Sequence, residues 1–331
     1  MKMEQIKWGI IGCGSVTELK SGPAFNKINN SKLIAVMRRD GAKAKNYAQR
    51  HKVPKWYDKA EDLINDKEVN AVYIATPPDT HAKYAIMAMK TGKPVYVEKP
   101  MARNYKECQE MNEVSESTGV PLFVAYYRRS LPGFLLVKEL IEKGVIGDVR
   151  FVRIRLTKPF MESDLDSKNL QWRVIPEIAG GGHFFDLSSH QLDYLDFLFG
   201  PIIKSNGFAE NQAGRYSAED IVLANFKFES DVLGNGSWCF TSDFSAEEDV
   251  LEFIGEKGKI KFSTFNPIPV EVITSNGTEL IKYKNPENIQ YNLIQSIVDE
   301  LRGDGKCPST GKTAARTSRV MDSIVESYYN K

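Results

Sequence analysis

The stretch Ile10-Ile11-Gly12-Cys13-Gly14-Ser15-Val16 decides the fold of the N-terminal half of the chain. It follows the apolar run 6–11, which is typical of a buried strand. The two glycines permit a tight turn at the end of that strand, where the backbone can come close to a pyrophosphate. The third glycine of the usual pattern is replaced by Thr17, so the turn alone also fits an ordinary strand-to-helix connection. The candidate dinucleotide-binding residues are Gly12, Gly14, Ser15 and Val16.

Short apolar runs and helix-like segments alternate through the first 125 residues. Strands are expected at 6–11, 33–37, 71–75, 95–97 and 122–125, and helices at 42–50, 59–64, 80–91 and 105–118. This alternation is the pattern of consecutive βαβ units. It predicts an α/β Rossmann domain, a doubly wound parallel sheet, over residues 1–125.

The pattern changes after Pro132. A helix is expected at 133–143, then strands at 149–157, 221–229, 233–240, 249–255 and 259–263, and a closing helix at 314–328. Short turns separate several of these strands and favour hairpins. The second domain, residues 126–331, is therefore expected to be α+β with a large, mostly antiparallel sheet. We expect it to bind substrate and, through the open face of its sheet, a second copy of the chain, giving a homodimer or homotetramer.

The composition excludes several classes of protein. The 44 Lys and Arg residues balance 43 Asp and Glu residues, so no general nucleic-acid-binding charge is present. No apolar span reaches the length of a membrane helix, and the N-terminus lacks the apolar core of a signal peptide. The four cysteines are widely spaced, which argues against structural zinc and suits a reducing compartment. We expect a soluble cytoplasmic protein with no metal ion and no nucleic-acid partner.

The end of the second strand carries a clue to the choice of cofactor. An NAD-binding chain usually offers an acid to the ribose 2′-hydroxyl at this point, whereas this chain has Arg38 followed by Arg39. A planar guanidinium suits a phosphate, so the sequence favours NADP, with NAD as the alternative. In that alternative the arginines are solvated and Asp40 reaches the ribose.

Glu98-Lys99-Pro100 directly follows the expected strand 95–97. Ligands of open α/β sheets bind outside the carboxyl ends of the strands, so a lysine at this position is placed for chemistry. Taken alone, the same residues also fit a solvated lysine in a loop.

The third constellation lies in the second domain, where a glycine run leads into His183, Asp186 and His190. Asp186 and His190 are four residues apart and would share one helix face. An imidazole can accept the proton of an alcohol that is being oxidised, and a carboxylate can orient the imidazole or bind a substrate hydroxyl. The pair also fits a plain helix-surface contact. With His183 the group imitates a zinc site, which we disfavour because no fourth ligand is evident. His183 is expected to serve packing or substrate contact.

These features, in this order, resemble the glucose-fructose oxidoreductase, inositol dehydrogenase and rhizopine catabolism (Gfo/Idh/MocA) family over nearly the whole chain. The residues that carry the resemblance are Gly12, Gly14, Ala75-Thr76-Pro77-Pro78 with His81, Glu98-Lys99-Pro100, Arg129, Gly144, Gly147, Trp172-Arg173, Asp186 and His190. Two positions depart from the family pattern: Thr17, in place of a small residue, and His183, where an aliphatic residue is common.

The resemblance implies roles for several residues. Thr76, Pro77 and His81 would belong to the cofactor site, with Glu98 and Lys99 at the nicotinamide ribose and Trp172 and Arg173 beside the nicotinamide. The catalytic group would be Lys99, Asp186 and His190, and the Lys99-Pro100 bond would be cis. Further substrate contacts are expected from Tyr127, Arg173 and His183.

The expected reaction is hydride transfer between a nicotinamide and a secondary hydroxyl or keto carbon of a sugar or polyol. Lys99 would polarise the reacting oxygen, His190 would act as general base in the oxidation, and Asp186 would hold His190 or the substrate. The alternative is a regulatory protein of the same fold that binds the dinucleotide without catalysis. The presence of Lys99, Asp186 and His190 together favours the enzyme.

Overall fold

The computed structural model describes residues 2–166 and 169–329. The chain divides into two compact units, one of Met1–Ser130 with Pro286–Ala315 and the other of Leu131–Asn285 with Arg316–Lys331. The first boundary lies near the expected residue 125. Residues 286–315 differ from the expectation, because the sequence division placed them in the second domain and they fold with the first unit.

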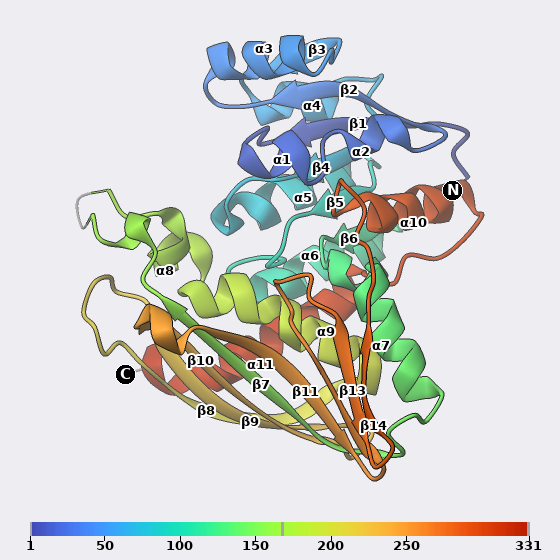
Figure 1. Ribbon diagram of the computed structural model, residues 1–331. Helices are drawn as coiled ribbons and strands as arrows, with labels where there is room; N and C mark the ends of the chain where they lie inside the picture. The colour runs from blue at the N-terminus through green and yellow to red at the C-terminus, as the bar shows by residue number, and fades with distance from the viewer. Residues whose placement is uncertain (1, 167–168, 330–331) are drawn as a thin grey trace. The chain divides into compact units, whose positions relative to one another are not determined.

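The first unit is built on a six-stranded, entirely parallel sheet (Figure 1). Its order is β3-β2-β1-β4-β5-β6. The strands are β1 (Ile6–Ile11), β2 (Ser31–Met37), β3 (Lys55–Tyr57), β4 (Ala71–Ile74), β5 (Val95–Val97) and β6 (Leu122–Val124). The order reverses between β1 and β4, which is where open α/β sheets bind their ligands. The predicted Rossmann domain is confirmed.

The helices of the first unit follow the strands in βαβ fashion. They are α1 (Ser15–Leu19), α2 (Ala24–Lys27), α3 (Gly41–Arg50), α4 (Ala60–Asn65), α5 (His81–Lys90), α6 (Tyr105–Thr118) and α10 (Tyr291–Arg302). α6 begins at an Asn104 side chain that accepts from Glu107 N and ends at Gly119 with φ +67°. α10 buries the face that carries Leu293, Ile297 and Leu301, which explains why this late segment belongs to the unit.

The second unit contains an eight-stranded sheet of order β14-β13-β12-β11-β7-β10-β9-β8. The strands are β7 (Val149–Pro159), β8 (Ile202–Glu210), β9 (Ile221–Phe228), β10 (Leu233–Ser242), β11 (Glu248–Gly255), β12 (Gly258–Phe262), β13 (Val270–Thr274) and β14 (Gly277–Ile281). Among the strands of this unit that the structure describes, only β7 and β10 pair in parallel. The predicted large, mostly antiparallel sheet is confirmed.

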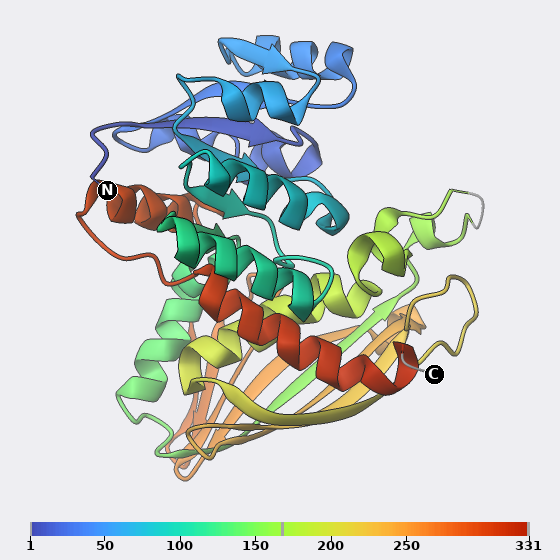
Figure 2. The ribbon, with the colours of Figure 1, turned by 180° about the vertical axis from the view of Figure 1, so that it is seen from behind.

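One face of this second sheet carries the helices (Figure 2). They are α7 (Pro132–Glu142), α8 (Pro176–Ala179), α9 (Ser189–Phe199) and α11 (Gly311–Tyr329), whose first residues belong to the first unit. Phe199 of α9 packs against Phe228 with ring centroids 5.4 Å apart. Ser205 of β8 donates to Ser323 of α11 over 3.2 Å. The core of this unit therefore lies between α9, α11 and the inner face of the sheet.

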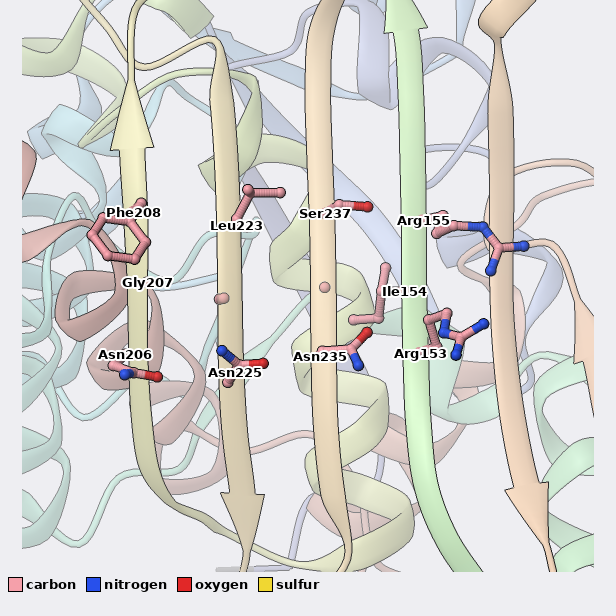
Figure 3. A pocket seen from close by; sticks show the side chains of 12 residues that line it. Arg153, Ile154, Arg155, Asn206, Gly207, Phe208, Leu223, Asn225, Asn235 and Ser237 are labelled. Carbon is pink, nitrogen blue, oxygen red and sulfur yellow. The ribbon is translucent and has the colours of Figure 1, made fainter.

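The outer face of the same sheet forms a shallow groove over β8, β9, β10 and β7 (Figure 3). Apolar side chains stand exposed on it: Phe208 is 79% exposed and Leu223 49%. Asn206, Asn225 and Asn235 lie side by side on adjacent strands. The sheet thus has one buried face and one mixed, accessible face.

Candidate functional site

The two glycines of the turn after β1 have different surroundings. Gly12 has φ +93°, and a Cβ there would lie 2.8 Å from Thr76 Cγ2, so only glycine fits. Gly14 is different, because a Cβ there would meet only Gly12 O, at 3.8 Å, among the described residues. The protein itself does not need Gly14 to be glycine. The open space in front of it fits a ligand that approaches the backbone closely, as a pyrophosphate does.

Thr17 completes this turn from inside the fold. Its side chain is fully buried, and its hydroxyl donates to Gly14 O over 2.8 Å. Its own carbonyl accepts from Tyr47 Oη, also over 2.8 Å. The departure from glycine at this position therefore stabilises the turn rather than blocking it.

The end of β2 separates the roles of Arg38 and Asp40. The Asp40 carboxylate caps α3 by accepting from Lys43 N over 3.1 Å, and this bond lowers the pKa of Asp40. Arg38 is exposed, and its Nη1 donates to Cys13 O of the glycine turn at 3.5 Å. Arg39 is exposed as well. The guanidinium of Arg38 thus lies beside the glycine turn, while the carboxylate of Asp40 caps the helix α3.

His81 joins two loops at the carboxyl edge of the first sheet. The ring is fully buried, with Nε2 2.7 Å from Thr76 O and Nδ1 3.1 Å from Pro100 O. Burial lowers the pKa of His81. The ring thus links the Thr76-Pro77 loop to the turn after β5. The Lys99-Pro100 bond in that turn is cis, as the resemblance implies.

A buried polar network lies directly behind Lys99. The Glu98 side chain is 7% exposed, and its Oε1 accepts from Tyr73 Oη over 2.5 Å and from Gln290 Nε2 over 2.7 Å. Its Oε2 faces the backbone N–H of Lys99 at 3.3 Å. The role of Gln290 was not predicted from the sequence. Tyr73 and Tyr96, inside buried strands, were the available signal, because buried tyrosine hydroxyls need partners.

In the second unit Asp186 pairs with an arginine. Arg173 Nε lies 3.1 Å from Asp186 Oδ2, and the Arg173 guanidinium lies 4.4 Å from the centre of the Trp172 ring. The expected single α-helix through Asp186 and His190 is interrupted, because Phe184–Ser188 form a π-helix and α9 begins at Ser189. Such π-turns are frequent at functional sites. His190 is buried at the start of α9, with its ring 6.3 Å from that of Phe265.

His183 points into the core of the second unit. It is 1% exposed, its Nε2 donates to Asp164 Oδ2 over 2.7 Å, and its ring packs against Phe240. The structure therefore favours packing over substrate contact for His183, because the ring is enclosed by side chains. Asp164 is equally buried.

Glu219 holds the glycine run that precedes His183. Its carboxylate accepts from Gly182 N over 2.9 and 3.0 Å and from the Tyr329 hydroxyl. Burial raises the pKa of Glu219 from its usual 4.5 to about 7. The turn that leads to the π-helix is thus attached to a carboxyl group that titrates near neutral pH.

The remaining candidates are placed as follows. Tyr127, 9% exposed, lies in the first unit under the guanidinium of Arg128, at 5.1 Å. Lys99 also belongs to the first unit, and Asp186 and His190 to the second. Within residues 2–166 and 169–329 no three His, Cys, Asp or Glu side chains gather as a metal site. No helix in that part of the chain is both long and apolar enough to cross a membrane.

Comparison with known proteins places this geometry in a family. The model of an oxidoreductase family with an NAD-binding Rossmann fold matches residues 6–126, and that of the GFO/IDH/MocA C-terminal domain matches residues 134–261. The chain belongs to the GFO/IDH/MocA oxidoreductase family. The glycine turn and the edge that carries Lys99 therefore lie in an NAD-binding domain of an oxidoreductase.

Individual relatives cover almost the entire chain. Oxidoreductase P35 of Formosa agariphila is 39% identical over 96% of this chain and 98% of its own length. The 1,5-anhydro-D-fructose reductase of Ensifer adhaerens is 24% identical over 92% and 91%. A levoglucosan dehydrogenase, solved with NADH and levoglucosan, superposes with a TM-score of 0.87 over 98% of both chains at 21% identity. At that identity the last likeness concerns the fold.

Proposed function

We propose that this protein is an NAD(P)-dependent dehydrogenase or reductase that acts on a secondary hydroxyl or keto carbon of a sugar or polyol. The observation that carries the proposal is the carboxyl edge of the first sheet. There the open space at Gly14 follows strand β1, and the Glu98-Lys99 turn follows strand β5. These two strands lie on either side of β4. An oxidoreductase family of which named relatives act on anhydro sugars supports the substrate class.

The cofactor proposed is NADP, with NAD as the alternative. Arg38 stands beside the glycine turn with an exposed guanidinium, and Asp40 is engaged as a helix cap. A cation therefore stands where the ribose 2′-position is recognised in this fold, and a phosphate there would gain a charge-assisted hydrogen bond. The bound nicotinamide supplies the hydride chemistry, and the protein supplies alignment and charge.

The catalytic roles follow from the chemistry of three side chains. Lys99 polarises the reacting oxygen of the substrate, and His190 accepts the hydroxyl proton in oxidation and returns it in reduction. Asp186, which is already paired with Arg173, orients His190 or a substrate hydroxyl. Tyr127 and Arg173 offer further substrate contacts, and Arg173 and Trp172 border the nicotinamide.

A substrate screen tests this function. The protein is mixed with NADP or NAD and a set of sugars, anhydro sugars and inositols, and with NADPH or NADH and the corresponding keto forms, while absorbance of the reduced cofactor is followed. We expect turnover of at least one carbohydrate, with NADP preferred. Cofactor binding without turnover of any of them would instead support the regulatory alternative.

We further propose that the protein acts in the cytoplasm as a homodimer or homotetramer. The four cysteines are free thiols, three of them buried, which suits a reducing compartment. The accessible outer face of the second sheet, with Phe208 and Leu223, is the surface available to a second copy.

A further inference from the structure

The turn that carries Lys99 rests on very little local structure. β5 has only three residues, and Glu98 N donates to Ile74 O over 2.8 Å at the point where the sheet ends. The Glu98 side chain then turns inward rather than toward solvent. A buried carboxylate must be satisfied by donors, so the groups that bind Glu98 also determine where the Lys99 backbone lies.

Gln290 is one of these groups, and it comes from the other end of the chain. Its side chain is fully buried between two tyrosines and Glu98. The amide Nε2 donates to Glu98 Oε1 over 2.7 Å, and the carbonyl Oε1 accepts from Tyr96 Oη over 2.8 Å. The Gln290 side chain makes no hydrogen bond that caps α10, although it occupies the N-cap position of that helix. Its hydrogen bonds are made to Tyr96 of β5 and to Glu98 of the Lys99 turn instead.

The same segment also holds the chain that follows the glycine turn. Gln290 N donates to Lys20 O over 3.2 Å, and Asn288 Nδ2 donates to Leu19 O over 2.7 Å. Asn288 Oδ1 in turn accepts from Lys27 Nζ over 2.7 Å. One short stretch, residues 288–290, therefore contacts both the chain that follows the glycine turn and the carboxylate of Glu98.

We propose that Gln290 is a positioning residue of the cofactor site, which holds the Glu98-Lys99 turn in register with the glycine turn through its amide. The proposal rests on the function proposed above. Loss of the amide leaves the buried Glu98 carboxylate with one donor fewer, so the turn shifts or takes up water. Because Gln290 itself lies behind Glu98, its effect on the cofactor is indirect.

The test compares Gln290→Leu with Gln295→Leu, a matched change on the same helix. Gln295 donates only to Asp299 within α10 among the bonds described, over 2.8 Å. NADPH affinity is measured by fluorescence titration, and hydrogen exchange is followed in peptides covering 98–103 and, for reference, 6–11. For Gln290→Leu we expect at least tenfold weaker NADPH binding and at least tenfold faster exchange confined to 98–103. Gln295→Leu should stay within twofold of the unchanged protein in both.

Each other outcome has a defined meaning. Unchanged exchange at 98–103 in Gln290→Leu overturns the positioning role, as does an equal rise in both peptides, which marks a merely structural residue. If the unchanged protein binds neither NADPH nor NADH, the proposed function fails, and the exchange pattern still decides the role of Gln290 in the turn. Should Gln290→Leu not fold, Tyr96→Phe replaces it, with threefold faster local exchange expected and unchanged exchange contradicting the proposal.

Discussion

The two sheets of this protein use their residues in opposite ways. In the first sheet, β4, β5 and β6 are buried at every position, so their side chains pack in the core. In the second sheet, strands such as β9 alternate buried and more exposed positions. A fully covered parallel sheet can offer function only at its strand ends, where Gly12, Thr76 and Lys99 lie. A half-covered antiparallel sheet offers a whole face.

That outer face is ordered by its register. Asn206, Asn225 and Asn235 are consecutive partners across β8, β9 and β10, and Asn235 pairs in turn with Arg153. Arg153 and Arg155 then meet Glu252 at 3.6 and 2.8 Å. The charges on this side largely compensate one another within the sheet. A partner surface there would be recognised by amides and apolar side chains more than by net charge.

The largest effect is expected where the strand ends of the first unit supply the chemistry. Lys99→Met removes the charge proposed to polarise the substrate oxygen, so turnover of the substrate found in the screen should fall by about 10² to 10⁴. Lys106→Met, on the exposed surface of α6, is the control. Steady-state kinetics of the two variants provides the measurement, and full activity of Lys99→Met would refute the assignment.

His190 of the second unit is the proposed proton acceptor, so His190→Asn should lower turnover by a similar factor of about 10² to 10⁴. Oxidation needs a neutral imidazole, so the unchanged enzyme should lose activity at acidic pH, and the variant should lack this acidic limb. NADPH binding should survive, because the role proposed for His190 is toward the substrate hydroxyl and not toward the dinucleotide. A rate profile with the same acidic limb in the variant would assign the base to another group.

Glu219 makes the stability of the second unit depend on pH. The pKa of Glu219 is raised in the folded state to about 7. Its contribution to stability is therefore complete below its unfolded value of 4.5 and is lost as pH rises through 7. In the unchanged protein, this loss amounts to roughly 3 kcal/mol of the free energy of unfolding, and Glu219→Gln should abolish it. Chemical denaturation between pH 4.5 and 8 measures it, with the exposed Glu229→Gln as control.

Tyr329 and His183 face Glu219 and shape the same titration. If the free energy of unfolding of Glu219→Gln still falls with pH as it does in the unchanged protein, the pH dependence arises from one of those neighbours.

A tenfold to hundredfold effect is expected for cofactor choice at the first sheet. Arg38→Asp replaces a charge-assisted hydrogen bond by repulsion, so NADPH should bind about ten to a hundredfold more weakly while NADH is spared. Lys32→Asp, at the opposite end of β2, should change neither dissociation constant. Equal affinities for the two cofactors in the unchanged protein would defeat the NADP assignment.

The smallest effect on folding is expected at the outer face of the second sheet. Phe208→Glu should leave the free energy of unfolding within about 0.5 kcal/mol, because Phe208 is largely exposed in the single chain. It should nevertheless convert an oligomer to a monomer in sedimentation experiments. Leu135→Glu, on the exposed side of α7, should remain oligomeric. A monomeric unchanged protein at micromolar concentration would remove this surface from consideration.

Much of the first unit was predictable because its pattern is local. β1, β2, β4, β5 and β6 and the helices α3 to α6 lie within a few residues of the predicted ranges, since apolar runs and glycine stops mark them directly. β3 was missed because its three residues at the sheet edge are only partly buried. β8 was missed because most of its residues face solvent, so it shows no apolar run.

The site shows the same division. Residues of the glycine turn and of Glu98-Lys99-Pro100 are recognisable one by one, because their backbone chemistry is local. His183 was open between packing and substrate contact, since a histidine before a helix gives no sign of its direction. The bond to Asp164 and the π-helix after it were needed to show that the ring turns inward.

The sequence by itself determined the fold class, the family and the location of the candidate chemistry, because periodicity, glycines and short motifs act over a few residues. Tertiary structure alone decided that residues 286–315 fold with the first unit and that Gln290 reaches Glu98 across 192 positions of the chain. It also decided that Asp40 caps a helix while Arg38 lies beside the glycine turn. Hydrogen bonds of this kind depend on which buried donors and acceptors meet in space, and no local pattern records that meeting.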